Sequence, residues 1–258
     1  MEKLKKAWIA GAVLACFLAD SGTTLRAAGI RNAGADHEVK TQVLTMPLDS
    51  MDGLEVQSIR ENGLEPVKTT ADVATYQGRR ALRVVNDPGV AADGTGAGDQ
   101  ILALVKNSDF KDGTIEADVV GLPRQGAPLG TPGFVGIAFR VHDRGTQYEA
   151  FYLRPGNSRS DNQLRRNHAS QYVSWPDFPW KRLRDENPGL YESYVDLDPG
   201  AWTRIKIVVA GTTAKLYVNG ADKPCLVVND LKLGDSDGRI ALYSSSDTEA
   251  YFSNLRVR

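Results

Sequence analysis

The stretch Phe134-Val-Gly-Ile-Ala-Phe-Arg-Val141 decides the fold class of this chain. Large apolar side chains occupy every second position of it, and Gly136, Ala138 and Arg140 lie between them. Successive side chains of a β-strand point to opposite faces, so this spacing predicts a strand with one apolar face and one face of small residues that ends at an arginine. If the second face lines the concave side of a curved sheet, it leaves room for a ligand.

The same alternation recurs along most of the chain. Further segments with a period of two are residues 114–120, 203–209, 214–218, 239–243 and 250–257. Asn219-Gly220 directly follows one of them, and this dipeptide is a strong signal for a hairpin turn. Short strands separated by turn residues, with hardly any segment of helical period, predict an all-β sandwich or barrel.

Composition supports a folded domain and limits its partners. The chain has 258 residues, 41% of them hydrophobic and 24% charged, with a formal net charge of -1. This is the composition of a globular protein, and an all-β domain can reach this size without a second domain. A balanced charge gives no support to a nucleic-acid partner, whereas a neutral ligand such as a carbohydrate or glycoconjugate fits it.

The N-terminal stretch is predicted to be a targeting segment. Lys3, Lys5 and Lys6 precede the apolar run 7–19, which is the layout of a secretory signal. We therefore expect residues 1–28 to be a signal peptide and the protein to be exported, whether periplasmic, cell-surface or extracellular. The run is shorter than the roughly 20 residues that span a bilayer, so no membrane span is expected.

The remaining boundaries follow from this assignment. Residues 29–40 are small and polar and are expected to be a flexible lead-in, and residues 41–258 a single domain. Val13-Leu14-Ala15-Cys16 resembles a lipoprotein signal, which leaves a lipid anchor at Cys16 as an alternative. Cys225 then stands alone in an apolar run and is expected to be a small buried hydrophobic residue.

No cofactor is expected, with calcium as the open alternative. The sequence has no CxxC spacing for structural zinc. Asp196-Leu-Asp198 and Asp235-Ser-Asp237 offer the oxygen ligands that calcium takes, but aspartate is also an ordinary turn residue.

Several strand sequences resemble the concanavalin A-like lectin/glucanase superfamily. They are FKDGTIEAD (110–118), GFVGIAFR (133–140), YEAFYLR (148–154), WTRIKIVV (202–209), LYVNG (216–220) and YFSN (251–254). Within this superfamily the chain is most similar, over residues 48–258, to laminin-G-like modules and to bacterial 3-keto-disaccharide hydrolase-like domains. The resemblance implies an antiparallel jelly-roll sandwich with a sugar site on its concave face.

The segment 154–194 interrupts the strand pattern and is expected to be one long functional loop with a short helix near residues 160–168. It supplies aromatic rings on which a sugar can stack and planar polar groups that can bind hydroxyls. The substrate-binding candidates, in this segment and on the strand before it, are Arg140, Arg154, Asn157, Asp161, Arg165, Tyr172, Trp175, Trp180 and Glu192. In the alternative interpretation, the rings pack the loop onto the sheet and the charges face water.

Glu149 and His168 are the catalytic candidates. Glu149 shares its strand face with apolar residues, so it is expected either to pair with Arg140 or another strand neighbour, or to have a raised pKa. The 3-keto resemblance implies a base, His168 or Glu149, that removes a hydrogen beside a ketone while Arg140 or Arg154 stabilises the enolate.

The predicted function is thus that of an exported carbohydrate-recognising domain. The sequence leaves open whether it is an enzyme; the enzyme version is a glycoside hydrolase or a 3-keto-glycoside-cleaving enzyme. A hydrolase would need two carboxylates around the scissile bond. The alternatives are a non-catalytic glycan-binding module and a laminin-G-like adhesion domain. A carboxylate pair or a histidine–carboxylate pair at a cleft would favour the enzyme.

Overall fold

The structure, a computed structural model, describes residues 44–45, 63–87 and 101–258, which belong to a compact unit spanning Thr41–Arg258. The predicted signal peptide, the lead-in and Cys16 lie outside the described residues. Among the residues that the structure describes, no helix combines the length and apolar composition that a membrane crossing requires.

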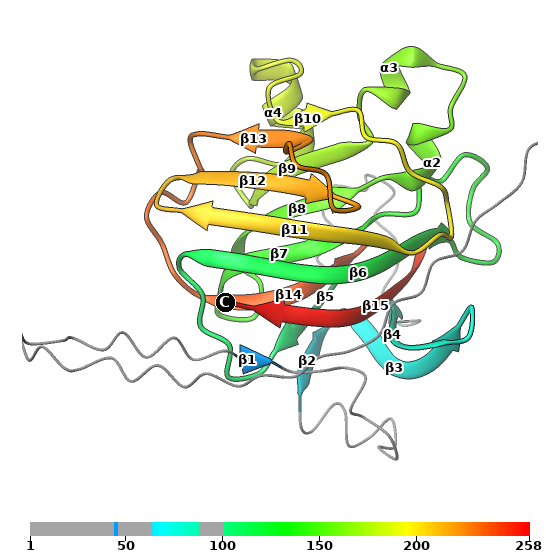
Figure 1. The fold of residues 1–258 in the computed structure, drawn as a ribbon, viewed down its shortest axis with the longest axis horizontal. Helices are drawn as coiled ribbons and strands as arrows, with labels where there is room; N and C mark the ends of the chain where they lie inside the picture. Colours follow the sequence, from blue (N-terminus) through cyan, green and yellow to red (C-terminus); the bar gives the residue numbers. More distant parts are fainter. Residues whose placement is uncertain (1–43, 46–62, 88–100) are drawn as a thin grey trace, which may run out of the picture. The chain divides into compact units, whose positions relative to one another are not determined.

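Two antiparallel β-sheets lie one behind the other (Figure 1). In the described ranges the first sheet has the order β13 (Leu226–Val228), β12 (Thr213–Val218), β11 (Thr203–Ala210), β6 (Gly113–Pro123), β15 (Thr248–Val257), β4 (Arg79–Asn86) and β3 (Thr69–Tyr76), with β1 (Leu44–Thr45) paired to β15. The second has the order β10 (Glu192–Ser193), β9 (Ser170–Trp175), β8 (Gln147–Leu153), β7 (Val135–His142), β14 (Arg239–Ser244), β5 (Ile101–Val105) and β2 (Leu64–Val67). The predicted antiparallel sandwich is confirmed.

The core lies between the sheets and is built from the apolar faces of the alternating strands. Ile205, Ile207 and Val209 of β11 are buried, as are Ile137 and Phe139 of β7. All of them belong to one continuous hydrophobic cluster. Every strand that the alternation predicted is present.

The Asn219-Gly220 turn differs from the expected hairpin. Both residues have left-handed φ angles of 52° and 74°, and the amide of Ala221 donates to the carbonyl of Val218 at 3.1 Å. The tight turn is therefore formed, but β12 pairs with β13, which begins only at Leu226. Residues 219–225 thus form a longer connection.

The segment 154–194 holds more regular structure than a single loop. It contains the strands β9 and β10 and the helices α2 (Pro155–Ser158), α3 (Gln163–Arg166) and α4 (Trp180–Glu186). The predicted short helix is α3, where Asn162 caps the amide of Arg165 at 3.2 Å. Strand β9 was missed because its serines and glutamine hide the apolar period, although nearly all of the strand is buried.

A row of residues crosses the second sheet on one face and leads to the site. Register pairs place Tyr243 opposite Gly136, Gly136 opposite Tyr152, Tyr152 opposite Gln171, and Gln171 opposite Glu192. The rings of Tyr152 and Tyr243 stack at 5.0 Å. A Cβ on Gly136 would lie 2.6 Å from the Cβ of Tyr152, so only glycine fits between them.

Candidate functional site

Glu192 is the centre of a group of polar residues at the edge of the second sheet, where β10 pairs with β9. Only 2% of its side chain is exposed. Arg184 of α4 donates from Nε to Oε1 and from Nη2 to Oε2, both at 2.7 Å. This two-pronged geometry is the strongest form of an arginine–carboxylate pair, so it fixes both side chains.

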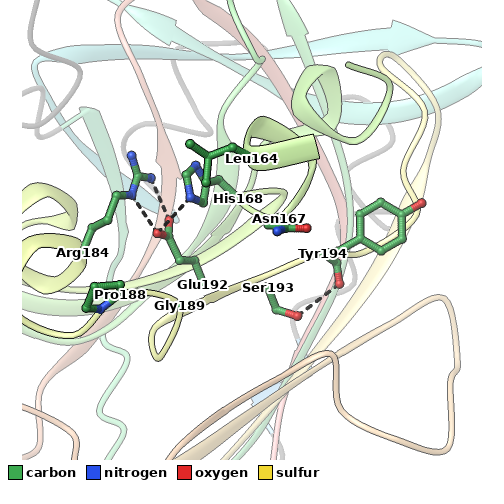
Figure 2. Close-up of a pocket in the computed structure, with 9 residues that line it drawn as sticks. All are labelled: Leu164, Asn167, His168, Arg184, Pro188, Gly189, Glu192, Ser193 and Tyr194. Atoms are coloured by element: carbon green, nitrogen blue, oxygen red, sulfur yellow. Dashed lines mark hydrogen bonds and ion pairs between the residues drawn. The ribbon is translucent and has the colours of Figure 1, made fainter. Parts of the chain in front are cut away.

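Two further residues contact the same carboxylate. Nη1 of Arg154 lies 3.7 Å from Oε2, and Nε2 of His168 lies 3.3 Å from Oε1. Figure 2 shows the carboxylate between the Arg184 guanidinium and the His168 ring. We call Arg154, His168, Arg184 and Glu192 the Glu192 cluster.

Arg154 is held by its surroundings at the end of β8. Its Nη1 donates to Gln171 Oε1 at 3.2 Å and to the carbonyl of His168 at 3.1 Å, and its Nη2 donates to the Tyr152 hydroxyl at 3.0 Å. Its guanidinium also lies over the rings of Tyr152 and Phe134, at 5.0 and 5.4 Å from their centroids. These contacts leave Arg154 almost completely buried.

The surroundings of His168 favour a neutral imidazole. Burial lowers its pKa below the ordinary value of 6.5, the negative charge of Glu192 opposes this, and Arg184 and Arg154 lower the pKa further. Because Nε2 faces a carboxylate, we assign the ring hydrogen to Nε2 and the free electron pair to Nδ1. Such a ring can accept a proton at neutral pH, and its exposure of 15% gives it access to a ligand.

Two adjacent pockets meet at His168 and Arg184, which line both of them. The larger, of about 630 Å³, is also lined by Leu164, Asn167, Pro188, Gly189, Glu192, Ser193 and Tyr194 (Figure 2). The smaller, of about 240 Å³, is also lined by Pro132, Phe134, Arg154, Asn157, Arg165 and Trp180. We call the smaller one the arginine pocket.

The structure brings six of the predicted site residues together around these pockets. They are Arg154, Asn157, Arg165, His168, Trp180 and Glu192. Asn157 links two of them, because its Nδ2 donates to the carbonyl of His168 at 3.2 Å and its Oδ1 accepts from Arg165 Nη2 at 3.1 Å. The segment 154–194 therefore supplies most of the lining of both pockets, with residues from helices and strands.

Arg140, Glu149 and Tyr172 lie elsewhere, buried between the two sheets. Arg140 Nη1 lies 3.5 Å from Glu149 Oε2, and both side chains are 0% exposed. The Tyr172 hydroxyl donates to Glu149 Oε1 at 2.8 Å. Glu149 therefore forms the ion pair that the sequence allowed, and burial raises its pKa despite that partner. These three predicted residues do not reach the pockets.

The Arg140 side chain does not follow the alternation of side chains along β7, and the reason is local. Its φ angle is 51°, and the register of β7 against β8 shifts between Phe139 and His142. The bulge turns the arginine away from the face of Ala138 and toward Glu149. There its guanidinium donates to the carbonyls of Lys111, Gly211 and Gly234 and also contacts Asp112, at distances from 2.6 to 3.3 Å.

Trp175 and Asp161 do not line either pocket. Trp175 is half-buried and packs against the core, whereas Asp161 is exposed. Cys225 is a free, half-buried thiol whose pKa is raised by burial to about 11, as suits a small residue packed against the core.

The acidic turns are occupied by cations of the chain. Arg159 contacts Asp196 at 2.9 Å and Asp198 at 2.7 Å, and Lys111 contacts Asp235 at 2.9 Å. Within the described ranges, no group of three or more His, Cys, Asp or Glu residues is arranged to hold a metal ion. Calcium binding remains an expectation from sequence alone.

Arg184 and Phe134 are the site residues that sequence reasoning missed. Trp180 and Arg184 are four residues apart, so a helix there places them on one face, and the guanidinium lies 4.6 Å from the Trp180 ring centroid. That spacing was the available signal for Arg184. Phe134 gave no signal, because it looked like the first residue of an ordinary strand.

Comparison with known proteins agrees with this fold. The structure matches the carbohydrate-binding module CBM66 from Bacillus subtilis with a TM-score of 0.51 at 16% identity, covering 76% of this chain and 96% of that one. It also matches a protein of unknown function with a galectin-like fold from Bacillus subtilis, with a TM-score of 0.48 at 12% identity, covering 78% and 91%. No curated protein matches the sequence. Residues 50–258 match the family described as the 3-keto-alpha-glucoside-1,2-lyase-like domain, and the chain belongs to that family.

Proposed function

We propose that this protein is a carbohydrate-active enzyme of the 3-keto-glycoside 1,2-lyase type, with the Glu192 cluster as its catalytic site. The observation that carries the proposal is the His168–Glu192 pair at 3.3 Å in the wall of an open pocket. A neutral imidazole beside two guanidinium groups is the equipment needed to remove a proton and to stabilise the resulting anion. The family to which the chain belongs supports the same chemistry.

In the first step, His168 Nδ1 takes the hydrogen from C2 of a glycoside that carries a ketone at C3. The electron pair of the C2–H bond forms a C2=C3 double bond, and the C3 oxygen becomes an enolate. Arg154 and Arg184 are the groups that would stabilise this negative charge. Glu192 acts through His168, since a carboxylate on Nε2 fixes the tautomer and stabilises the imidazolium.

In the second step, the enolate re-forms the C3 ketone, a C1=C2 double bond forms, and the C1–O bond breaks. The departing oxygen takes the proton from His168, which returns to its neutral form. The products are a 3-keto sugar with a C1=C2 double bond and a free alcohol. No oxidant, reductant or second substrate is consumed.

A two-carboxylate glycosidase mechanism has less support. Among the described residues that line the two pockets, Glu192 is the one carboxylate, and both of its oxygens are bound by Arg184. A non-catalytic glycan-binding module is the second candidate, because the fold is shared with a carbohydrate-binding module and two rings, Phe134 and Trp180, line the arginine pocket. We also propose, from the signal-like residues 1–28, that the protein acts outside the cytoplasm.

The test is to incubate the protein with 4-nitrophenyl 3-keto-α-glucoside and to identify both products. Elimination yields nitrophenol and an unsaturated sugar that has one water less than the hydrolysis product. Deuterium at C2 should slow the reaction. Release of nitrophenol with only the hydrated sugar and no effect of C2 deuterium would contradict the lyase, and thermal stabilisation by the glycoside without cleavage would favour the binding module.

A further inference from the structure

The arginine pocket holds one positive charge that the proposed chemistry does not use, that of Arg165. Three guanidinium groups line it, from Arg154, Arg165 and Arg184, and its described lining residues include no carboxylate. Glu192 forms ion pairs with Arg154 and Arg184 but not with Arg165. With His168 neutral, one carboxylate leaves two of the three positive charges uncompensated.

Arg165 is the clearest example of a positive charge without a carboxylate partner. Its Nη2 donates to the carbonyl of Gly130 at 2.9 Å and to Asn157 Oδ1 at 3.1 Å, and both acceptors are neutral. In the part of the chain that the structure describes, it makes no ion pair. Most neighbouring exposed cations differ from it in this respect: Arg159, Lys181 and Arg182 all pair with carboxylates at 2.5 to 2.9 Å.

The guanidinium of Arg165 is also held in place, unlike that of a free surface arginine. Asn157, its partner, is itself buried and donates to the carbonyl of His168. Hydrogen bonds therefore connect Arg165 through Asn157 to the residue that carries the proposed base. The rings of Phe134 and Trp180 line the same pocket and offer apolar surface to the C–H groups of a sugar.

We propose that the arginine pocket binds a carboxylate substituent of the glycoside, so that the substrate class is an acidic glycoside of the uronic-acid type. A planar guanidinium with two parallel N–H groups matches the geometry of a carboxylate. The inference rests on the proposed function only in taking the bound molecule to be a glycoside. A pocket of about 240 Å³ has room for a single sugar ring.

The test compares binding of methyl α-glucuronoside with that of its neutral isostere, methyl α-glucuronamide, by calorimetry on the intact protein. We expect the acid to bind about 10-fold more tightly at low salt, as hydrogen bonds between charged groups contribute. Arg165→Gln should reduce this preference to about 3-fold or less, because the acid should lose more affinity than the amide. Arg165→Lys, which keeps the charge but not the planar fork, should retain part of it.

Arg166→Gln is the matched control. Arg166 is the neighbouring residue of α3, but its guanidinium lies over Tyr194 and it does not line the arginine pocket. This variant should keep the full preference. Equal affinity for acid and amide in the wild type, or a preference that survives in folded Arg165→Gln, would overturn the proposal, as would tight binding of a 6-sulfated glucoside with no binding of the acid.

These measurements separate the two proposals. Binding of the acid requires no ketone and no turnover, so a preference for the acid without cleavage of any 3-keto glycoside would contradict the lyase and support the acidic ligand. Cleavage of neutral 3-keto glycosides without any preference for a carboxylate would support the lyase and contradict the acidic ligand.

Discussion

His168 derives its proposed reactivity from its neighbours. Burial and two arginines oppose the charged imidazolium, while Glu192 holds Nε2 and favours it. The ring is thereby kept neutral but oriented, which is what a base needs before it meets its substrate. Nothing in the order of residues around position 168 shows this, because the three partners come from β10, α4 and the end of β8.

The first prediction at this scale concerns the base itself. His168→Ala should lower kcat for cleavage of a 3-keto glycoside by about 10²- to 10⁴-fold, the usual contribution of a positioned base. The melting temperature should change little, because the ring is at the pocket wall and not in the core. A loss of less than tenfold in steady-state assays would remove His168 from the mechanism.

The second prediction concerns pH. Since the base must be unprotonated, kcat/KM should rise as pH increases through the lowered pKa of His168 and level off by neutral pH. Glu192→Gln removes the contribution that raises this pKa, so the rising limb should move to lower pH while kcat falls. Asp198→Asn, whose carboxylate pairs with Arg159 away from the pockets, should leave the profile unchanged. A shift of the Glu192→Gln limb to higher pH would contradict the assignment.

At the scale of elements, Asp118 joins four strands of the first sheet on the face opposite the core. Its carboxylate on β6 accepts from Arg79 of β4 at 2.9 Å, from Arg204 of β11 at 3.1 Å and from Asn254 of β15 at 2.7 Å. Burial alone would raise the pKa of Asp118, but the hydrogen bonds from Asn254 and Arg204 and the positive charges of Arg204 and Arg79 outweigh it, so the pKa is lowered. Only 7% of the Asp118 side chain is exposed.

A third prediction follows for stability. A lowered pKa means that Asp118 stabilises the folded state above its unfolded pKa of about 4 and that this contribution is lost as pH falls through the folded value. Asp118→Asn should therefore cost about 1 to 3 kcal/mol at neutral pH and less in acid, measured by urea unfolding. Asp161→Asn, at an exposed position, should have little effect at either pH. An equal loss of stability by Asp118→Asn at neutral and acid pH would show that packing, not charge, is responsible.

The elements also show how much of the fold could be predicted from the sequence. Strands with one apolar face, such as β7 and β11, could be predicted because burial on one side imposes a period of two. Strand β9 could not, because its polar residues are satisfied by hydrogen bonds inside the protein: Ser170 donates to the carbonyl of Ser193, and Gln171 donates to that of Tyr191. Six of the predicted residues line the two pockets, but Arg140 was misplaced, since a left-handed residue at a bulge breaks the alternation on which its placement rested.

At the scale of the whole domain, Arg140 of the buried Arg140–Glu149 pair links the two sheets. Glu149 lies on β8, and the guanidinium of Arg140 also binds the carbonyl of Gly211, in the turn between β11 and β12 of the other sheet. Buried pairs of this kind add little when intact but are costly to break, because the remaining charge has no solvent.

The fourth prediction tests this link. Arg140→Met should destabilise the fold by about 3 to 5 kcal/mol, since it leaves Glu149 buried without its cation and three carbonyls without their donor. The measurement is the midpoint of urea unfolding, with Arg144→Met as control, because Arg144 is exposed and pairs with Glu65 at the sheet edge. If both variants unfold at the same midpoint, the buried pair does not hold the sheets together.

The Glu192 cluster has one property that bears on its evolution. All four of its members lie between residues 154 and 192, in a continuous piece of chain that is attached to the sheet along β8 and β9. A single recombination event could therefore transplant the entire cluster onto another sandwich, together with the edge strands β9 and β10. In such an architecture reactivity can diversify faster than the scaffold that carries it.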